Sequence, residues 1–357
     1  MNILFVYYVP SGGVETLNRQ RSLALKKIGM NCHFLYYENR RDLLNDHAAP
    51  VFITNNDQEI KQILETGKYQ AIVITSDFQA LPRFQSLGYQ GKMIIEVQGY
   101  GPKHVARKVF QSVVPLVTRY ADGLLNPKTP HIEQLFHELF PTVPKFQFNN
   151  CFDTTKFSYQ KTTGHPHPIV AWIGRIEDNK NWREFLFIGA KLIEKVNPNI
   201  QLYMFEDPTL STQRERQKFE ATISRLNLQN HVTLHANVPN ENMAEYYSRI
   251  GDSGGFLCST SKVEGAPYAI LEALSCKCPI LTTDSDGVRS SIIHNETGKY
   301  YTIGNISEAV TQAVELMNNT EIREHIRSKG YEHVKVNFSP ELYGKHFRNM
   351  LQAIGVN

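Results

Sequence analysis

The sequence predicts an α/β protein with two doubly wound parallel sheets, one in each half of the chain. Apolar segments fit for buried strands alternate with segments of helical spacing, as is typical of such sheets. The alternation starts over after residues 154–168, a stretch rich in Thr, His and Pro that is typical of a linker. The 357 residues also exceed what one hydrophobic core usually supports. We therefore expect two domains, 1–160 and 161–339, with a last helix at 340–357 packing back onto the first.

Each half begins with a strand, a loop and a helix. The first helix is expected at 15–28 and the second at 182–196, from the spacing of their apolar residues. Buried strands are expected in the first half at 3–8, 32–37, 71–75, 93–97 and 123–126, and in the second half at 169–173, 202–205, 232–234, 255–258 and 280–282. In parallel sheets, ligands gather where the strands end.

The segment from Glu264 to Glu272 carries two carboxylates on either side of an expected helix start. Pro267 suits a first helical position, and the apolar residues from Ile270 onward continue the helix. Glu264 then lies in the entering loop and Glu272 in the second turn, at a helix terminus that favours phosphate. The alternative is that both carboxylates merely complement the helix dipole.

Two loops have the composition of anion sites. Gly12 and Gly13 lack side chains, so backbone N–H groups there can approach a phosphate. The second loop, after the strand at 169–173, begins with Gly174 and supplies Arg175 and Lys180. Taken alone, a double glycine is more often a turn, and cations in a loop are usually solvated. Their occurrence at the equivalent corner of both halves favours a joint site.

Composition excludes several classes of protein. A net charge of +3, without a nucleic-acid motif, gives no reason to expect nucleic acid as a partner. No run reaches the roughly 18 apolar residues of a membrane span, and the first residues lack the features of a signal peptide, so we expect a cytoplasmic protein. The five cysteines are scattered in mainly apolar segments, and we expect them to be small buried hydrophobes.

Together these residues resemble the retaining glycosyltransferases of family 4, which have the GT-B fold of two Rossmann-like domains facing a central cleft. The resemblance runs from Met1 to about Met317. It rests on the Gly-Gly-Val-Glu loop at 12–15, the Gly-Arg-x4-Lys loop at 174–180, the Glu-x7-Glu segment at 264–272, and the Ala-Leu-x4-Pro-Ile-Leu-Thr segment at 273–282. Asn149 and Asp153 before the linker add a weaker similarity.

The resemblance implies a sugar donor that is a nucleotide diphosphate, bound mainly by the second domain without a metal or a cofactor. Arg175 and Lys180 match the family's cations for the leaving diphosphate, Glu272 its acceptor for the ribose hydroxyls, and Glu264 its acceptor for the sugar hydroxyls. The remaining donor-side positions line the sugar and diphosphate or close over the phosphates: Gly12, Gly13, Gly174, Gly265, Ala266, Pro267 and Tyr268. The implied donor is a UDP-sugar, or next GDP-mannose.

The implied reaction moves the sugar to an acceptor hydroxyl of a glycan, a glycolipid or a cell-surface polysaccharide, with retention of the anomeric configuration. Attack on the face from which the diphosphate leaves needs no protein nucleophile. Glu264 is therefore assigned to sugar binding and to charge in the transition state. The acceptor is expected to be chosen by first-domain loops such as residues 39–57, and the sequence leaves its identity and the oligomeric state open.

The chain departs from the family pattern at several positions. Gln98 stands where many relatives have a histidine near the donor sugar, and this position makes it a catalytic candidate beside Glu264, Arg175 and Lys180. It can still hydrogen-bond a sugar hydroxyl, but it cannot carry a proton at neutral pH. His104 is a candidate substitute on the acceptor side, or an ordinary surface histidine. Ser290 replaces a common glutamate, and 203–208 lacks the family's Gly-x-Gly. Asp284-Ser285-Asp286 resembles a metal motif of another fold, but turn chemistry explains it and we expect no metal.

Three alternatives remain open. The chain could bind a nucleotide sugar or a glycan without turnover, as the departures at Gln98 and Ser290 suggest. A nicotinamide dehydrogenase is a weaker hypothesis, because Gly12-Gly13 lacks the third glycine of a dinucleotide fingerprint. The segment 103–116 mixes cations with apolar residues, so it either contacts the inner face of a membrane peripherally or packs on the sheet.

Overall fold

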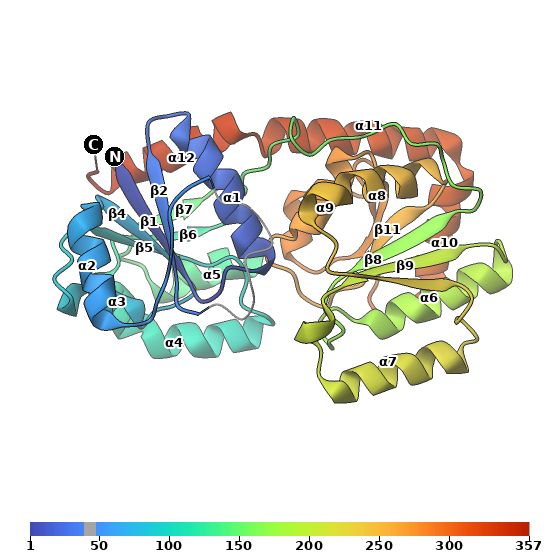
Figure 1. Cartoon of the computed structure of the whole chain (residues 1–357), viewed down its shortest axis with the longest axis horizontal. Coiled ribbons are helices and arrows are strands. Elements are labelled where there is room, and N and C mark those ends of the chain that lie inside the picture. Colours follow the sequence, from blue (N-terminus) through green and yellow to red (C-terminus); the bar gives the residue numbers. More distant parts are fainter. Residues whose placement is uncertain (39–47, 357) are drawn as a thin grey trace. The chain divides into compact units, whose positions relative to one another are not determined.

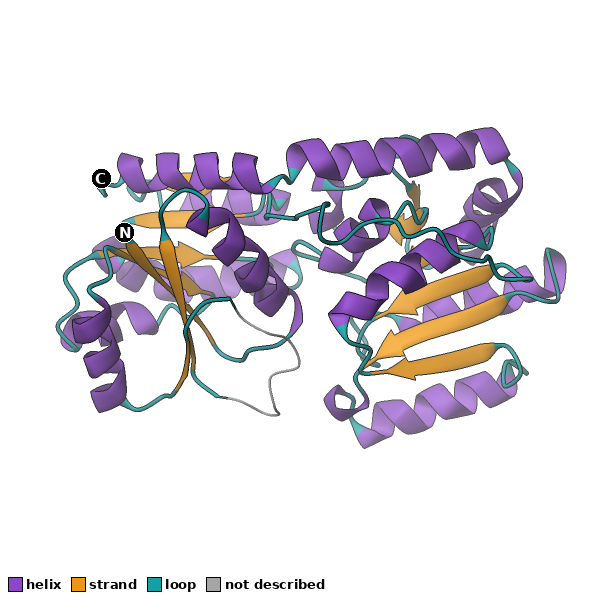
Figure 2. Cartoon of the chain, turned by 45° about the horizontal axis from the view of Figure 1, so that its top comes forward, coloured by secondary structure: helices purple, strands orange, loops and turns teal. Residues whose placement is uncertain are grey.

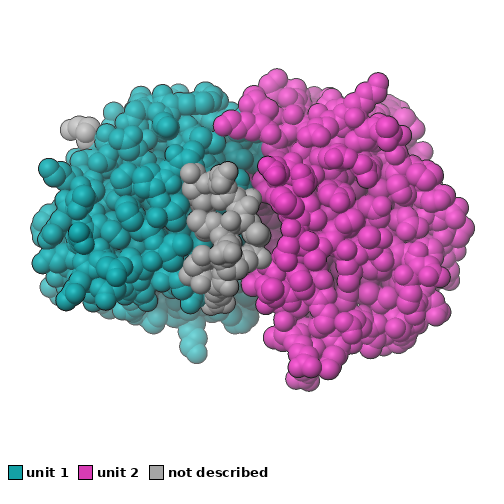
Figure 3. Space-filling view, viewed as in Figure 1, with its two compact units in different colours: residues 1–153, 337–357 teal, residues 154–336 magenta. Residues whose placement is uncertain are grey.

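The computed structural model describes residues 1–38 and 48–356. The chain forms two compact units, which Figure 3 shows in two colours: unit 1 is Met1–Asp153 with Asn337–Asn357, and unit 2 is Thr154–Val336. Each unit has one parallel sheet with helices on both faces (Figure 1), so the predicted α/β class is confirmed. Of the expected acceptor segment 39–57, residues 39–47 lie outside the described residues.

Unit 1 has a seven-stranded sheet in the order β3-β2-β1-β4-β5-β6-β7. The chain order reverses between β1 and β4, which is the topological switch point of such a sheet. The strands are β1 (Asn2–Tyr7), β2 (Asn31–Tyr36), β3 (Val51–Ile53), β4 (Ala71–Thr75), β5 (Lys92–Glu96), β6 (Gly123–Asn126) and β7 (Lys145–Gln147). The helices are α1 (Gly12–Lys26), α2 (Asp57–Gly67), α3 (Ala80–Ser86), α4 (Lys103–Tyr120), α5 (Pro130–Leu139) and α12 (Pro340–Ala353).

Unit 2 has a six-stranded sheet in the order β10-β9-β8-β11-β12-β13, and its strands run in one direction (Figure 2). The strands are β8 (Ile169–Ile173), β9 (Gln201–Glu206), β10 (Val232–Ala236), β11 (Phe256–Ser259), β12 (Ile280–Thr283) and β13 (Lys299–Tyr301). The helices are α6 (Trp182–Lys195), α7 (Gln213–Arg225), α8 (Asn240–Asp252), α9 (Tyr268–Ser275), α10 (Ile306–Asn318) and α11 (Thr320–Asn337), with short 3-10 turns at Pro208–Leu210 and Gly287–Ser290.

The strands that the sequence did not predict are β3, β7 and β13. Each has three residues, and each lies at an edge of its sheet. An edge strand is paired on one side only, so it needs neither the length nor the apolar run that marks a central strand.

The boundaries of the units differ from the expected 160 and 339. Residues after Asp153 already pack on unit 2, where Phe157 is buried and its carbonyl accepts a hydrogen bond from Ser275 Oγ. The Tyr159 hydroxyl donates to Asp252 at 3.0 Å. The segment 154–168 therefore lacks apolar periodicity but is anchored by individual side chains, which a reading of composition does not reveal.

A buried ion pair joins α1 to the centre of the sheet in unit 1. Arg21 Nη1 donates to both carboxylate oxygens of Glu96 at 2.8 and 2.9 Å, and both side chains are buried. Thr75 Oγ1 also donates to Glu96, at 2.9 Å, and Arg21 Nη2 donates to Asn18 Oδ1 at 2.5 Å. The guanidinium lies 3.8 Å from the ring centroid of Phe5. This network fixes the helix that begins at the two glycines against the strand that precedes Gln98.

Helix α12 packs in unit 1. Phe347 contacts Phe5 with ring centroids 5.9 Å apart, and Gly344 lies against Ile28. Within the described residues, no helix has both the length and the apolar character needed to cross a membrane.

Candidate functional site

Lys180 and Glu264 meet in unit 2 at the carboxyl end of the sheet. Lys180 Nζ lies 2.5 Å from Glu264 Oε1, and the side chains are 23% and 12% exposed. Lys180 reaches this position from the loop after β8, and its side chain passes close to Gly174, where an added Cβ would lie only 3.1 Å from Lys180 Cγ. The structure thus brings together three of the predicted residues.

The backbone at Lys180 is held by a buried threonine directly after the neighbouring strand β11. Thr260 follows β11, and its Oγ1 lies 2.9 Å from the carbonyl of Lys180 and 3.1 Å from that of Asn181. The same oxygen accepts a hydrogen bond from Trp172 Nε1 at 3.1 Å. The ammonium group therefore projects from a loop whose backbone is tied to two adjacent strands.

The loop that carries Glu264 is fixed by the loop after β12. The Glu264 N–H donates to the Ser285 carbonyl at 2.9 Å, and the Gly287 N–H donates to the Glu264 carbonyl at 3.0 Å. A Cβ on Gly287 would lie 1.8 Å from the carbonyl oxygen of Gly265, so no larger residue fits there without moving the Glu264 loop. This close approach of the two backbones fixes the position of the loop that carries the Glu264 carboxylate.

Arg175 lies in the same loop as Lys180 but is more exposed. Its guanidinium pairs with Glu177 at 2.9 Å, and its side chain is 52% exposed. A pair this exposed is worth little, so the guanidinium can leave Glu177 at small cost to contact an anion.

Glu272 lies in the second turn of α9, as predicted, and is 5% exposed. Its Oε1 accepts a hydrogen bond from Asn240 Nδ2 at 2.9 Å, and its Oε2 accepts one from the Tyr247 hydroxyl at 3.2 Å. Burial, together with the charge of Glu272, raises the pKa of Tyr247 well above its usual range. Two side chains of α8, those of Asn240 and Tyr247, therefore orient the Glu272 carboxylate.

The turn that enters α9 contains the other predicted donor-side positions of unit 2. Pro267 is the N-cap of α9 rather than its first residue. Gly265, Ala266 and Pro267 are partly exposed, whereas the Tyr268 side chain is buried. Tyr268 can therefore contribute its backbone to a ligand, but its ring belongs to the core.

The remaining predicted residues belong to unit 1. Gly12 and Gly13 are exposed and begin α1, and Gly12 has a φ of +74°, which favours glycine. Gln98 and Asn150 form a reciprocal amide pair: Gln98 donates at 3.2 Å and Asn150 at 2.7 Å. His104 is exposed in the first turn of α4.

Two cations of α4 contact α5. Lys103 Nζ contacts Gln134 Oε1 at 2.5 Å, and Arg107 donates to Glu138. Ala106, Phe110, Val113 and Val117 of the same helix are buried. These contacts favour the reading in which this helix packs its apolar face on the sheet.

The departures from the family pattern each have a local partner. Glu206 pairs with Arg216. Asp284 pairs with Arg289 at 2.7 Å, and the Ser290 hydroxyl contacts the Gly287 carbonyl at 3.4 Å. Among the described residues, no group of three or more His, Cys, Asp or Glu side chains is placed to hold a metal ion.

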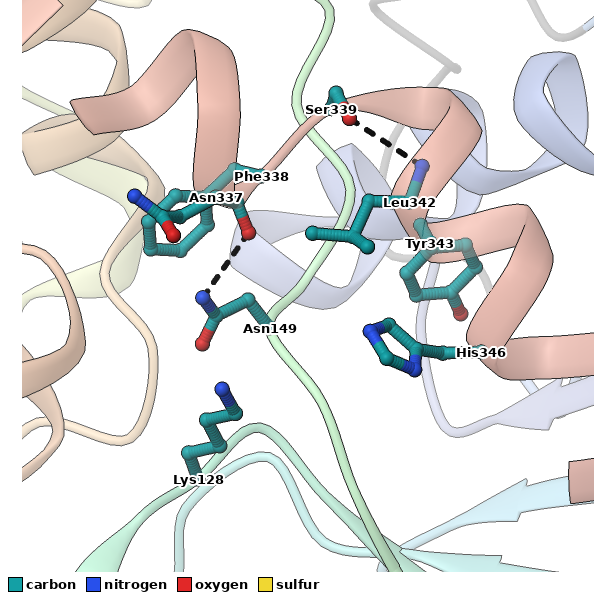
Figure 4. A pocket seen from close by; sticks show the side chains of 8 residues that line it. All are labelled: Lys128, Asn149, Asn337, Phe338, Ser339, Leu342, Tyr343 and His346. Carbon is teal, nitrogen blue, oxygen red and sulfur yellow. Dashed lines mark hydrogen bonds between the residues drawn. The ribbon is translucent and has the colours of Figure 1, made fainter. Parts of the chain in front are cut away.

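A small pocket in unit 1, of about 40 Å³, lies beside α12 (Figure 4). Asn149 donates to the Asn337 carbonyl at 3.1 Å at its edge, and Ser339 caps α12 by accepting from the Leu342 N–H at 3.3 Å. The full lining is Lys128, Asn149, Asn337, Phe338, Ser339, Leu342, Tyr343 and His346. None of the predicted site residues lines this pocket.

The sequence analysis missed the residues that orient the predicted ones. Thr260, Gly287, Asn240 and Tyr247 lie on other elements, and no spacing along the chain links them to Lys180, Glu264 or Glu272. The available signal was limited to the position of Thr260 and Gly287, two and five residues after the expected buried strands at 255–258 and 280–282, in loops at the ligand side of a parallel sheet.

Comparison with known proteins places the chain in a family. Residues 153–333 match the family described as "Glycosyl transferases group 1". The 2-deoxystreptamine N-acetyl-D-glucosaminyltransferase of Niallia circulans is 23% identical over 184 residues, which are 52% of this chain and 45% of the relative. The capsular polysaccharide biosynthesis glycosyltransferase CapM of Staphylococcus aureus is 23% identical over 58% of this chain and 50% of its own length. The matches thus span about half the length of these relatives.

Solved structures show the same fold. Anabaena Alr3699/HepE in complex with UDP and glucose has a TM-score of 0.83 at 16% identity, covering 99% of this chain and 100% of that protein. Sucrose-phosphate synthase of Thermosynechococcus elongatus has a TM-score of 0.81 at 16% identity, with the same coverage. These similarities confirm the predicted GT-B fold. Because the family match covers half of the chain, the protein belongs to the glycosyl transferases of group 1.

Proposed function

We propose that this protein is a metal-independent, retaining glycosyltransferase that transfers a sugar from a nucleotide-diphosphate sugar, preferably a UDP-sugar, to an acceptor hydroxyl. The observation that carries the proposal is the Lys180–Glu264 pair, held at the carboxyl end of a parallel sheet and beside the start of α9. Family membership and the UDP-bound HepE structures support it.

The cations serve the leaving diphosphate. An ammonium group carries three donors, and Glu264 takes one from Lys180, so the group can also donate to phosphate oxygens. Arg175 leaves its exposed partner Glu177 and adds a planar donor pair. Fixed cations aimed at a leaving group stabilise the negative charge that develops there as the glycosidic bond breaks.

The carboxylates serve the sugars. Glu272, oriented by Asn240 and Tyr247, accepts hydrogen bonds from the ribose hydroxyls. Glu264, fixed through its backbone, accepts from hydroxyls of the transferred sugar and offsets positive charge at the anomeric carbon. The leaving phosphate oxygen takes the proton of the attacking acceptor hydroxyl, so no protein nucleophile is required.

The biological setting that fits is the synthesis of a glycan, a glycolipid or a cell-surface polysaccharide. The relative CapM takes part in capsular polysaccharide biosynthesis. The relative from Niallia circulans carries a name that refers to N-acetylglucosamine transfer. UDP-N-acetylglucosamine and UDP-glucose are therefore the first donors to test, followed by GDP-mannose.

Ligand-dependent thermal stability tests the donor site. A UDP compound should raise the melting temperature, since a ligand that binds only the folded state stabilises it by mass action. Lys180→Ala and Glu272→Ala each remove a charged partner, so each should weaken UDP binding by roughly ten- to a hundredfold.

Lys191→Ala is the matched control, because it removes an exposed lysine from α6 of the same unit. It should retain the melting shift of the original protein. Unchanged UDP affinity in both Lys180→Ala and Glu272→Ala would refute the assignment of these residues.

A further inference from the structure

A group of tyrosines surrounds one carboxylate at the carboxyl end of the sheet in unit 1. We call Tyr8, Tyr37, Asp77 and Tyr100 the Tyr8 cluster. Tyr8 directly follows β1, Tyr37 follows β2, Asp77 lies two residues after β4, and Tyr100 lies in the loop after β5. These are four adjacent strands of the sheet, and they include the switch point between β1 and β4. Ligands of doubly wound sheets bind at that place.

The polar groups of the cluster lie around Asp77, and the Tyr8 hydroxyl itself contacts the Ser76 carbonyl at 3.5 Å. The Tyr37 hydroxyl donates to Asp77 Oδ2 at 2.8 Å. Burial raises the pKa of Tyr8 to about 12, with smaller contributions from Asp77 and Tyr100, so its phenol stays protonated at neutral pH. Burial and then Asp77 raise the pKa of Tyr100 in the same direction. The cluster therefore offers neutral hydroxyl groups beside one carboxylate.

The rings of the cluster pack on neighbouring aromatic rings, and among the four residues of the cluster Tyr8 is the exposed one. Tyr100 packs on Phe78 and Phe110, with ring centroids 6.1 and 5.4 Å away. Tyr8 meets the ring of Tyr37 edge to face at 5.9 Å and remains 43% exposed. An exposed aromatic ring that is held by its neighbours is a rigid apolar surface with a polar edge.

The charge of the cluster selects the kind of ligand. Arg83 lies 5.4 Å from the Tyr37 ring centroid, but its guanidinium pairs with Asp57 at 2.7 Å and also contacts Asn55. Among the described residues, the charge within the cluster itself is the carboxylate of Asp77, which repels a phosphate or a carboxylate. A carboxylate and tyrosine hydroxyls instead match the hydroxyls of an uncharged sugar, and an aromatic ring matches its apolar face.

We propose that the Tyr8 cluster is a binding site for a neutral saccharide, which is the acceptor of the transfer reaction. The inference rests on the proposed function for its role in transfer, and it names the acceptor class that the fold alone leaves open. Tyr8 supplies the stacking surface, and Asp77 with the tyrosine hydroxyls supplies hydrogen bonds.

Saturation-transfer NMR on the full chain tests this inference. The probes are maltose, cellobiose, lactose and N,N′-diacetylchitobiose as neutral sugars and glucose 6-phosphate as a charged one, each with and without UDP. At least one neutral disaccharide should bind, and more strongly than glucose 6-phosphate. Tyr8→Ala should weaken that binding by about fivefold or more, and Tyr8→Phe, which keeps the ring, should largely restore it.

Tyr120→Ala is the matched control, since Tyr120 lies at the end of α4 in the same unit. It should bind the disaccharide as the original protein does. The inference is overturned if no neutral probe binds, if glucose 6-phosphate binds more strongly, or if Tyr8→Ala binds as well as the control. The rise in melting temperature with UDP separates the donor-site proposal from the saccharide-site proposal. Tyr8→Ala should still show this rise. If the original protein does not show it, the donor site is wrong.

Discussion

Gly287 shows how one residue sets the position of a candidate donor-binding carboxylate. It has no role in chemistry, yet it lies where the loop after β12 touches the backbone of Glu264 and Gly265. Lys180 and Glu264 were predictable from the sequence, because their residue types and spacing match a known pattern. The positioning role of Gly287 was not predictable, because the contact that requires a glycine joins segments that no local pattern connects.

Gly287→Ala should displace the Glu264 loop, because its Cβ would lie 1.8 Å from the Gly265 carbonyl oxygen. We expect a loss of roughly 1–3 kcal/mol in stability, as for other overpacked sites, and weaker UDP binding by calorimetry. Gly88→Ala is the control: a Cβ there meets no atom within 4 Å, although its φ of +94° carries some strain. Equal UDP affinity in the two variants would show that Gly287 does not position the site.

At the scale of elements, the central strands and the α1 and α6 helices were predictable because each buries a continuous or periodic apolar pattern. The edge strands β3, β7 and β13 were not, because three residues are too few to carry such a pattern. The buried Arg21–Glu96 pair was also not predictable. Its partners are 75 residues apart, and an arginine within an amphipathic helix normally lies on the solvent side.

Arg21→Met should destabilise unit 1 by about 3–5 kcal/mol, because it leaves Glu96 buried without its cation. Lys27→Met, at the C-cap of the same helix, is the control. It removes an exposed pair with Glu341, which is worth at most about 1 kcal/mol.

Both tryptophans, Trp172 and Trp182, belong to unit 2, so their fluorescence reports on the unfolding of unit 2. It does not report on unit 1, where Arg21 lies. Hydrogen exchange in peptides that contain β5 should accelerate in Arg21→Met while the tryptophan unfolding midpoint stays near that of Lys27→Met. Unchanged exchange in β5 would contradict a stabilising role for the ion pair.

For the whole molecule, the repeat of strand, loop and helix in the two halves predicted the fold class, and the structure and its relatives confirm it. The unit boundaries were less predictable from the sequence, because contacts of individual side chains, such as those of Phe157 and Tyr159, determine that the segment after Asp153 packs on unit 2. The proposed reaction needs both sites. Most candidate donor residues lie in unit 2, and the Tyr8 cluster lies in unit 1. The donor residues match a known sequence motif, whereas the residues of the Tyr8 cluster match none, so the donor side is the more predictable of the two.

The most direct test of the central claim is the release of UDP from UDP-glucose and UDP-N-acetylglucosamine by the purified full chain, without acceptor and in excess EDTA. Glycosyltransferase activity of the proposed kind predicts slow UDP release from at least one donor. The chelator should not reduce the rate, and Lys180→Ala should lower it by about a hundredfold. If neither donor nor GDP-mannose releases its nucleotide, although UDP binds, the protein is a nucleotide-sugar binder without turnover and the proposed activity is wrong.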